Sequence, residues 1–247
     1  MKRISGAALI ILITAFICGC GWKVDPTQQE VNSNLDINNG DPSDAATASG
    51  IWQGSYTISG QTYSVTGVID AAGEARFALS DGVNFAGTVT TSNTGISGPF
   101  SVYDPDGVIN GPTSLSGSFS AGGNMTAQYA AQAGNSPAYD GTLNVAYNSI
   151  YSNPAALSLI EGTWANDGLS FTITNGRLTG SDNQDGCSYS GNITVPSSAN
   201  NIYRLSLDIS GCGKAGSYNG MGFIDGGGFT YFVSNSRQAH SETLIQQ

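Results

Sequence analysis

From about residue 50 to the end of the chain, apolar and polar residues alternate with a period of two. Successive side chains of a β-strand point to opposite faces, so this period is typical of strands with one buried and one solvated face. No stretch shows the spacing of an amphipathic helix, in which apolar residues recur every three or four positions. The pattern therefore predicts an all-β fold of short antiparallel strands.

About eight strands are expected in each half of the chain. In the first half they lie near residues 51–58, 62–70, 74–80, 83–91, 95–103, 112–120, 124–131 and 138–147. In the second half they lie near 160–165, 168–174, 176–181, 187–195, 202–210, 216–224, 228–234 and 237–245. Three dipeptides typical of tight hairpin turns fall between expected strands: Asp81-Gly82, Asn175-Gly176 and Asp225-Gly226. The strands should therefore follow one another as a meander.

The two halves share sequence features. Each begins with Gly-x-Trp, at Gly50-Ile51-Trp52 and at Gly162-Thr163-Trp164, and each repeats a triplet of an aromatic residue or leucine, any residue and glycine. A stretch rich in Ser, Asn, Pro and Ala separates them. We therefore predict two tandem meander barrels, with domain 1 at residues 50–148, a linker at 149–158 and domain 2 at 159–247.

Glycines and tryptophans are expected inside these barrels. A glycine on an inward face lets a strand coil sharply, and it can either leave a cavity or admit a ring from an opposite strand. Trp52 and Trp164 are predicted to pack at the barrel floors, because a large ring with one polar edge suits such a position. The candidate inward glycines are Gly67, Gly87, Gly191 and Gly220.

One hairpin can be placed in register from the sequence. The strands at 187–195 and 202–210 match at every inward position if four pairs face each other: Val195 and Tyr203, Ile193 and Leu205, Gly191 and Leu207, and Tyr189 and Ile209. Cys187 then faces Gly211, one residue before Cys212. A bulge around Ser210-Gly211 would bring the two sulfur atoms together.

The first residues have the features of a secretory signal. Lys2 and Arg3 precede an apolar run at residues 4–17, which is shorter than the ~20 residues that a membrane-spanning helix needs. Ile17-Cys18-Gly19-Cys20 resembles the lipobox of bacterial lipoprotein precursors. That resemblance implies removal of residues 1–19, acylation of Cys20 and, because Gly21 rather than Asp follows it, sorting to the outer membrane. The alternative is an ordinary signal peptide cut near Gly19, which would leave Cys20 as a free thiol.

Residues 20–49 are predicted to form a flexible linker behind the lipid anchor. They are rich in Asn, Asp, Gln and Ser, and such a chain has an average reach of ~30 Å. The full chain has 8 basic and 18 acidic residues, and removal of residues 1–19 takes two basic ones, which leaves a net charge of −12. An acidic protein repels phosphate backbones, so nucleic acid is not expected as a partner. A cationic protein partner remains open.

The four cysteines fall into two pairs. Cys18 leaves with the signal and Cys20 takes the lipid, so Cys187 and Cys212 are expected to form a disulfide in an oxidising compartment. Structural zinc is the alternative, but these two thiols and His240, the single histidine, supply too few soft ligands. No metal and no cofactor is therefore predicted.

The start of the second half resembles the first hairpin of avidin-type barrels. The resemblance covers about 20 residues from Gly162, and Gly-x-Trp alone also opens lipocalins. In the avidin family an Asn and a Ser of this hairpin bind the ureido group of biotin, which corresponds to Asn166 and Ser170 here. The resemblance implies a small-ligand site, although tryptophans around the ligand, which that family also has, are missing beyond Trp164.

No catalytic constellation is visible, so we predict that the protein is not an enzyme. His240 alternates with Gln238 and Glu242 and is interpreted as a residue of a solvated tail or an edge strand. The acidic runs Asp104–Gly107 and Asp182–Gly186 are interpreted as turns, with a weak calcium site as the alternative.

The sequence thus favours an outer-membrane-anchored lipoprotein that serves the cell envelope as a non-enzymatic structural or interaction module. Two alternatives stay open. The first is a carrier that holds a small ligand in a barrel cavity, as lipocalins and avidins do. The second is an inhibitor of a cationic enzyme such as a lysozyme. The oligomeric state is not predicted.

Overall fold

The computed structural model describes residues 47–131 and 139–247, which belong to one compact unit. The predicted signal peptide, Cys20 and nearly all of the predicted 20–49 linker lie outside the described residues. Within them the chain is built of seventeen β-strands, one 3-10 turn and one short α-helix. The prediction of two all-β antiparallel barrels is confirmed.

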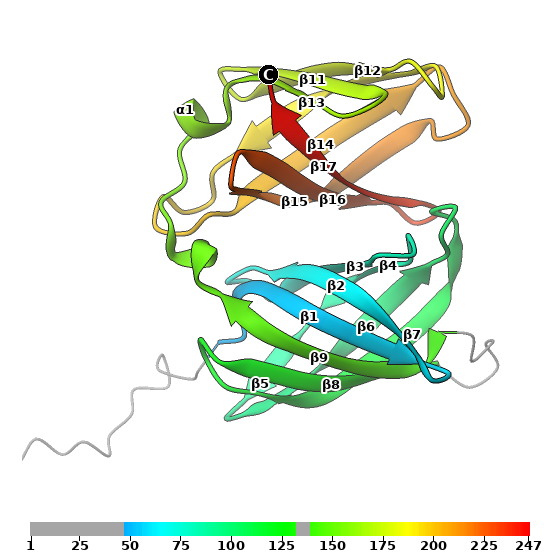
Figure 1. The fold of residues 1–247 in the computed structure, drawn as a ribbon, viewed down its shortest axis with the longest axis vertical. Helices are drawn as coiled ribbons and strands as arrows, with labels where there is room; N and C mark the ends of the chain where they lie inside the picture. The colour runs from blue at the N-terminus through cyan, green and yellow to red at the C-terminus, as the bar shows by residue number, and fades with distance from the viewer. Residues whose placement is uncertain (1–46, 132–138) are drawn as a thin grey trace, which may run out of the picture. The chain divides into compact units, whose positions relative to one another are not determined.

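The first barrel is a meander that closes on itself (Figure 1). Its sheet has the order β4-β3-β2-β1-β9-β8-β7-β6-β5, and the additional pairing of β4 with β6 closes the ring. The short strand β5 pairs with β6 alone. The strands are β1 (Gly50–Ile58), β2 (Gln61–Ile69), β3 (Glu74–Leu79), β4 (Asn84–Thr88), β5 (Thr90–Ser92), β6 (Gly95–Tyr103), β7 (Ile109–Phe119), β8 (Asn124–Ala131) and β9 (Gly141–Asn148).

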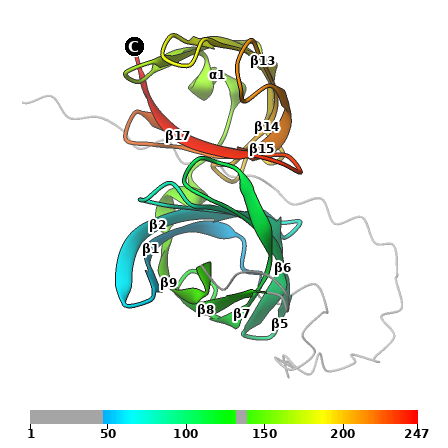
Figure 2. The ribbon, with the colours of Figure 1, turned by 90° about the vertical axis from the view of Figure 1, so that its right-hand side faces the viewer.

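The second barrel is a closed ring of eight strands in chain order, and Figure 2 shows it nearly along its axis. The register predicted for the strands at 187–195 and 202–210 is confirmed for three pairs, Ile193 with Leu205, Gly191 with Leu207 and Tyr189 with Ile209. The fourth, Val195 with Tyr203, lies just past the last pair of the ladder. The strands are β10 (Gly162–Ala165), β11 (Leu169–Thr174), β12 (Arg177–Asp182), β13 (Cys187–Thr194), β14 (Tyr203–Ser210), β15 (Gly216–Asp225), β16 (Gly228–Ser234) and β17 (Ala239–Gln246).

Most strand boundaries differ from the sequence prediction by one to three residues, and three differences have a clear structural reason. The strand expected at 83–91 is divided into β4 and β5. Pro112 lies inside β7 instead of opening it, next to a register shift between Val102 and Tyr103 of β6 where a missing N–H is tolerated. The strand expected to begin at residue 160 begins at Gly162, because the turn η3 (Ser149–Ser152) and the helix α1 (Leu157–Ile160) occupy the connection.

The two Gly-x-Trp motifs place their tryptophans in the same way. Trp52 and Trp164 are completely enclosed, and each indole Nε1–H donates to the carbonyl of the residue four positions earlier, Ala48 at 3.0 Å and Ile160 at 2.7 Å. A buried N–H without a partner would be costly, so these bonds make the burial of the rings possible. In the second barrel, α1 supplies that carbonyl and covers one end of the ring (Figures 1 and 2).

Aromatic rings fill the interior of the first barrel. The Tyr129 ring stacks on Phe85 with centroids 4.2 Å apart and meets Tyr56, Phe77 and Phe100 at steep angles. The inward glycines make room for the rings, since a methyl group on Gly67 would lie 2.1 Å from the ring of Phe77, its partner on β3. The rings therefore come from neighbouring strands and not from opposite ones as expected.

The glycines of the second barrel serve a different contact. A methyl group on Gly191 would lie 2.1 Å from the Ser206 carbonyl oxygen, and one on Gly220 would lie 1.8 Å from that of Phe232. Both glycines therefore allow close approach of the backbones of neighbouring strands, which the tight coiling of a small barrel requires. Neither of them leaves a cavity.

Besides the cores inside the two barrels, an apolar cluster of outward-facing residues joins one barrel to the other. Arg204 on β14 adds ion pairs to Asp70 and Glu74, which lie at the end of β2 and the start of β3. The two barrels are also joined by a backbone hydrogen bond, in which the Ala239 N–H donates to the Gly107 carbonyl at 2.8 Å. The buried members of the cluster are Ile51, Val68, Tyr151, Ile202, Met221, Phe223 and Phe232.

Candidate functional site: the open mouth of the second barrel

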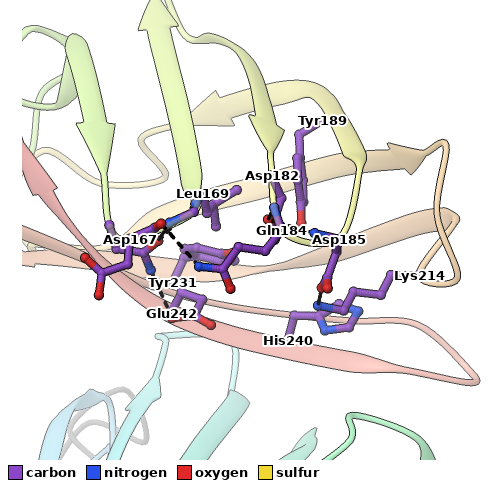
Figure 3. Close-up of a pocket in the computed structure, with 12 residues that line it drawn as sticks. Asp167, Leu169, Asp182, Gln184, Asp185, Tyr189, Lys214, Tyr231, His240 and Glu242 are labelled. Carbon is purple, nitrogen blue, oxygen red and sulfur yellow. Dashed lines mark hydrogen bonds and ion pairs between the residues drawn. The ribbon is translucent and has the colours of Figure 1, made fainter.

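A pocket of about 480 Å³ occupies the end of the second barrel away from Trp164 and α1. Its walls come from the β10–β11, β12–β13 and β14–β15 turns and from inward residues of β13, β16 and β17 (Figure 3). The volume lies within the range of natural small-molecule sites. Most of the side chains around it are polar or charged, which suits a hydrophilic ligand.

The pairing of β16 with β17 decides which residues face this pocket. Phe229 pairs with Leu244, Tyr231 with Glu242 and Val233 with His240. Side chains two apart on a strand share a face, so His240 and Glu242 face the same way as the fully buried Leu244. The interpretation of His240 as a solvated-tail or edge-strand residue is wrong, because a closed barrel has no edge and this face is the inner one.

Two buried tyrosines bring hydroxyl groups to the pocket. Tyr189 on β13 is 7% exposed and Tyr231 on β16 is 2% exposed, and both line the pocket. Neither hydroxyl has a hydrogen-bond partner among the described residues. The rings are buried while the hydroxyl oxygens remain accessible from the pocket, so both hydroxyls are available to a ligand or to water.

His240 is neutral in this position. Burial, followed by the charge of Lys214, lowers its pKa from 6.5 to about 4, and Asp185 opposes the change. Its Nε2 atom is buried without a hydrogen-bond partner, and its ring lies 5.2 Å from that of Tyr218. The imidazole is thus a third polar group at the mouth with unused hydrogen-bonding capacity.

Acidification should destabilise the protein through His240. The folded pKa of about 4 is below the ordinary 6.5, so the unfolded chain binds the proton more tightly. The stability this group contributes is complete above pH ~6.5 and is lost as the pH falls toward ~4. Between pH 7 and 5 we expect a loss of about 2 kcal/mol in the free energy of unfolding.

Urea unfolding of the wild type and of His240→Gln at both pH values measures this loss. Carboxylates titrate in the same range in both proteins, so the difference between the two pH dependences isolates the histidine. The variant should lose about 2 kcal/mol less than the wild type on acidification. Equal pH dependence in the two proteins would show that His240 is not buried neutral.

Glu242 and Asp182 give the pocket a negative potential. Partial burial raises the pKa of Glu242, Lys214 lowers it and Asp182 raises it. The same two carboxylates raise the pKa of the Tyr189 and Tyr231 hydroxyls. Burial, followed by Asp182, Asp185 and Glu242, raises the pKa of Tyr189 to about 12. Both tyrosines therefore stay protonated and can donate hydrogen bonds.

The turns at the mouth are held by their own side chains. Asp182 Oδ1 accepts from the backbone N–H groups of Gln184 at 2.8 Å and Asp185 at 3.2 Å, which agrees with the turn interpretation of this acidic run. Lys214 Nζ lies 2.5 Å from the Asp185 carboxylate, and this hydrogen bond followed by the lysine charge lowers the pKa of Asp185. Across residues 47–131 and 139–247, no three His, Cys, Asp or Glu side chains are grouped as metal ligands.

The predicted disulfide is present, and it supports the mouth. Cys187 and Cys212 are bonded, with their Cα atoms 5.0 Å apart. Cys187 ends the β12–β13 turn, and Cys212 lies in the β14–β15 turn two residues before Lys214. Gly211 has a φ of 84°, so the chain leaves the β14 ladder just before the bridge. The disulfide therefore joins two of the turns that wall the pocket.

The biotin-binding pair implied by the avidin resemblance is not assembled. Asn166 lies at the mouth, but its Oδ1 accepts from the backbone N–H groups of Gly168 and Leu169, and its Nδ2 donates to Glu242 at 3.3 Å. Ser170 alternates with the inward Leu169 and Phe171 and is on the outer face of β11. The structure brings Asn166 to the pocket and leaves Ser170 out of it.

The pocket residues that sequence reasoning missed are Tyr189, Tyr231 and Glu242 in particular. Tyr189 was placed correctly as an inward residue, but without a role. A signal for the other two did exist, because aligning Phe229 with Leu244 across the last hairpin puts Tyr231 opposite Glu242.

None of the helices in the described ranges is both long and apolar enough to cross a bilayer.

The chain was compared with protein-family models, with curated proteins and with solved structures, and none of them matches it.

Proposed function

We propose that the protein is a non-enzymatic binding protein of the cell envelope that holds a small hydrophilic molecule in the mouth of its second barrel. The observation that carries this proposal is the polar pocket of about 480 Å³, into which buried tyrosines direct unpartnered hydroxyls. Of the functions considered from the sequence, the small-ligand carrier fits this geometry best. A purely structural module would have no need for such a pocket.

The contrast between the two barrels supports this choice. In the first, five aromatic rings pack against one another, and the Tyr56 hydroxyl donates to the Tyr139 carbonyl at the corresponding end. In the second, the rings of Phe171, Tyr189 and Tyr231 pack below an open polar mouth. One barrel is thus filled as a scaffold, and the other combines an apolar floor with a hydrophilic entrance.

A plugged variant tests the proposal. Gln184 is an exposed turn residue at the mouth, so Gln184→Trp should cover the entrance without disturbing the core. Native mass spectrometry of protein isolated from its own envelope should show a bound small molecule on the wild type, and the plugged variant should lose it. Gln128→Trp, at an exposed position on the first barrel, is the matched control and should keep it. A wild type that carries no ligand and gains no thermal stability from any polar metabolite would contradict the proposal.

We also propose that Cys20 carries the lipid that attaches the protein to the outer membrane. The support is the resemblance of residues 17–20 to a lipobox, together with the polar linker that follows. Cys20→Ser should abolish labelling by a fatty-acid analogue and release the protein into the periplasmic or culture fraction. Cys18→Ser, which alters the neighbouring cysteine, should stay labelled and membrane-bound. A Cys20→Ser protein that still sediments with membranes would exclude this mode of attachment.

A further inference from the structure

The charges around the pocket of the second barrel do not cancel. Its basic side chain, Lys214, is already paired with Asp185. His240 is neutral near pH 7, as described above. The carboxylates of Asp182 and Glu242 remain; each accepts hydrogen bonds from neutral amide groups, and neither forms an ion pair with another described residue. The pocket therefore has a surplus of negative charge.

Carboxylates at a surface are common, and what makes this group a site is that two buried tyrosines direct their hydroxyls into it. Tyr231 is 2% exposed, and its hydroxyl has no partner among the described residues. Tyr231 pairs directly with Glu242 across the last hairpin, so the hydroxyl and the carboxylate are on the same inner face. Tyr189 brings a second such hydroxyl from β13 (Figure 3). The arrangement leaves both hydroxyls without a protein partner and open to a ligand that enters the pocket.

We propose that the ligand of this pocket carries a protonated amine, which binds between the carboxylates of Glu242 and Asp182 and the hydroxyls of Tyr189 and Tyr231. This inference depends on the proposed function, since it names the chemical class that the pocket accepts. An ammonium group offers three donors. It would therefore meet acceptors on the two carboxylates and the phenol oxygens together, with a ring face nearby.

Other ligand classes fit less well. An anion would meet two carboxylates with the lysine already paired, so it would be repelled. A neutral sugar or polyol could bond the hydroxyls, but it would leave the charge of Glu242 and Asp182 uncompensated in a partly enclosed space. A metal ion would need a group of three or more acidic, His or Cys ligands, and the described residues contain no such group. Of these classes, a protonated amine is the one that both compensates the negative charge of the carboxylates and donates hydrogen bonds to the free acceptors.

Matched pairs of probes test the inference. Putrescine and 1,4-butanediol have the same carbon chain and differ in charge, and glucosamine and glucose differ by one amine. Isothermal titration at low salt should show binding of both amines and about tenfold or weaker binding of both neutral partners. Affinity for the amines should fall as salt is added, because their attraction to the pocket is electrostatic.

Two variants connect the effect to the named groups. Glu242→Gln keeps the shape of the side chain and removes its charge, so it should weaken amine binding about tenfold. Tyr231→Phe removes one hydroxyl and should weaken it by about three- to tenfold. Asp225→Asn removes a charge outside this pocket, and Tyr203→Phe removes a buried hydroxyl that bonds Ala156 at the α1 end. Neither control should change the affinity measurably.

The outcomes separate the two proposals. Preferential binding of the amines that Glu242→Gln weakens supports the inference. Equal or tighter binding of the neutral partners, or of an anion such as citrate, blocked by Gln184→Trp, overturns the amine assignment and leaves the proposed function standing. Binding of no probe of any class overturns both. Amine binding that Glu242→Gln and Tyr231→Phe leave unchanged would place the amine elsewhere on the acidic surface and would also overturn the inference.

Discussion

Trp164→Ala is expected to lower the free energy of unfolding of the second barrel by about 3–5 kcal/mol, the usual range for removing a large buried ring. The indole is 1% exposed and meets the Phe229 ring edge-on with centroids 5.9 Å apart. Its Nε1–H satisfies the carbonyl of Ile160 at the end of α1. Removing the ring would leave a cavity at the floor and a buried carbonyl without a donor, so both terms act in the same direction.

Urea unfolding followed by circular dichroism measures this change, and two variants separate its parts. Trp164→Phe keeps most of the apolar volume but removes the donor, so it should cost about 1–3 kcal/mol. Ile245→Ala, at a position 54% exposed on β17, should stay within about 0.5 kcal/mol of the wild type. Trp164→Ala costing no more than Ile245→Ala would mean that the ring is not the plug of the barrel.

Replacing both Cys187 and Cys212 by alanine is expected to cost about 3.5 kcal/mol of stability, because the loop they close then has its full freedom in the unfolded chain. The two cysteines are 25 residues apart. In the folded protein the bridge also joins the β12–β13 and β14–β15 turns, so its removal should loosen the mouth as well. Ligand affinity should therefore drop together with stability.

Reduction offers an independent way to the same result. The wild type in excess reductant should unfold at the same urea concentration as the double variant, and reductant should leave the double variant unchanged. A single substitution, Cys187→Ala, should match the double variant in stability, because the remaining thiol has no partner. If the double variant were as stable as the oxidised wild type, the bridge would not constrain the unfolded state as described.

Much of the fold could be predicted because each half has a period of two with clear turn signals. The β13–β14 register followed from inward apolar positions alone, and the disulfide followed from sorting the four cysteines and agreed with that register. The tryptophans were predicted to be buried, and they are. Their hydrogen bonds to the carbonyls of Ala48 and Ile160 were not, because the connecting helix α1 has only four residues and no periodic signal.

The site was harder to predict than the fold, and His240 shows the reason. Its neighbours on the same face, Gln238 and Glu242, are polar, so the strand looked solvated. The inner face of a barrel is apolar in its middle and can be polar at its mouth. Near the mouth, a polar residue therefore does not indicate an outward position. Only the pairing of β17 with β16 places that polar segment inside. Which end of which barrel stays open depends on ring packing that periodicity does not record.

The most direct test of the account is a two-dimensional ¹H–¹⁵N NMR titration of the protein with putrescine. The account predicts shifts in backbone amides around the mouth of the second barrel, such as those of Gly168, Gln184 and Lys214, and none at Gly122 on a distant turn of the first barrel. Shifts spread over the acidic surface, or confined to the first barrel, would contradict the claim that this mouth is the binding site.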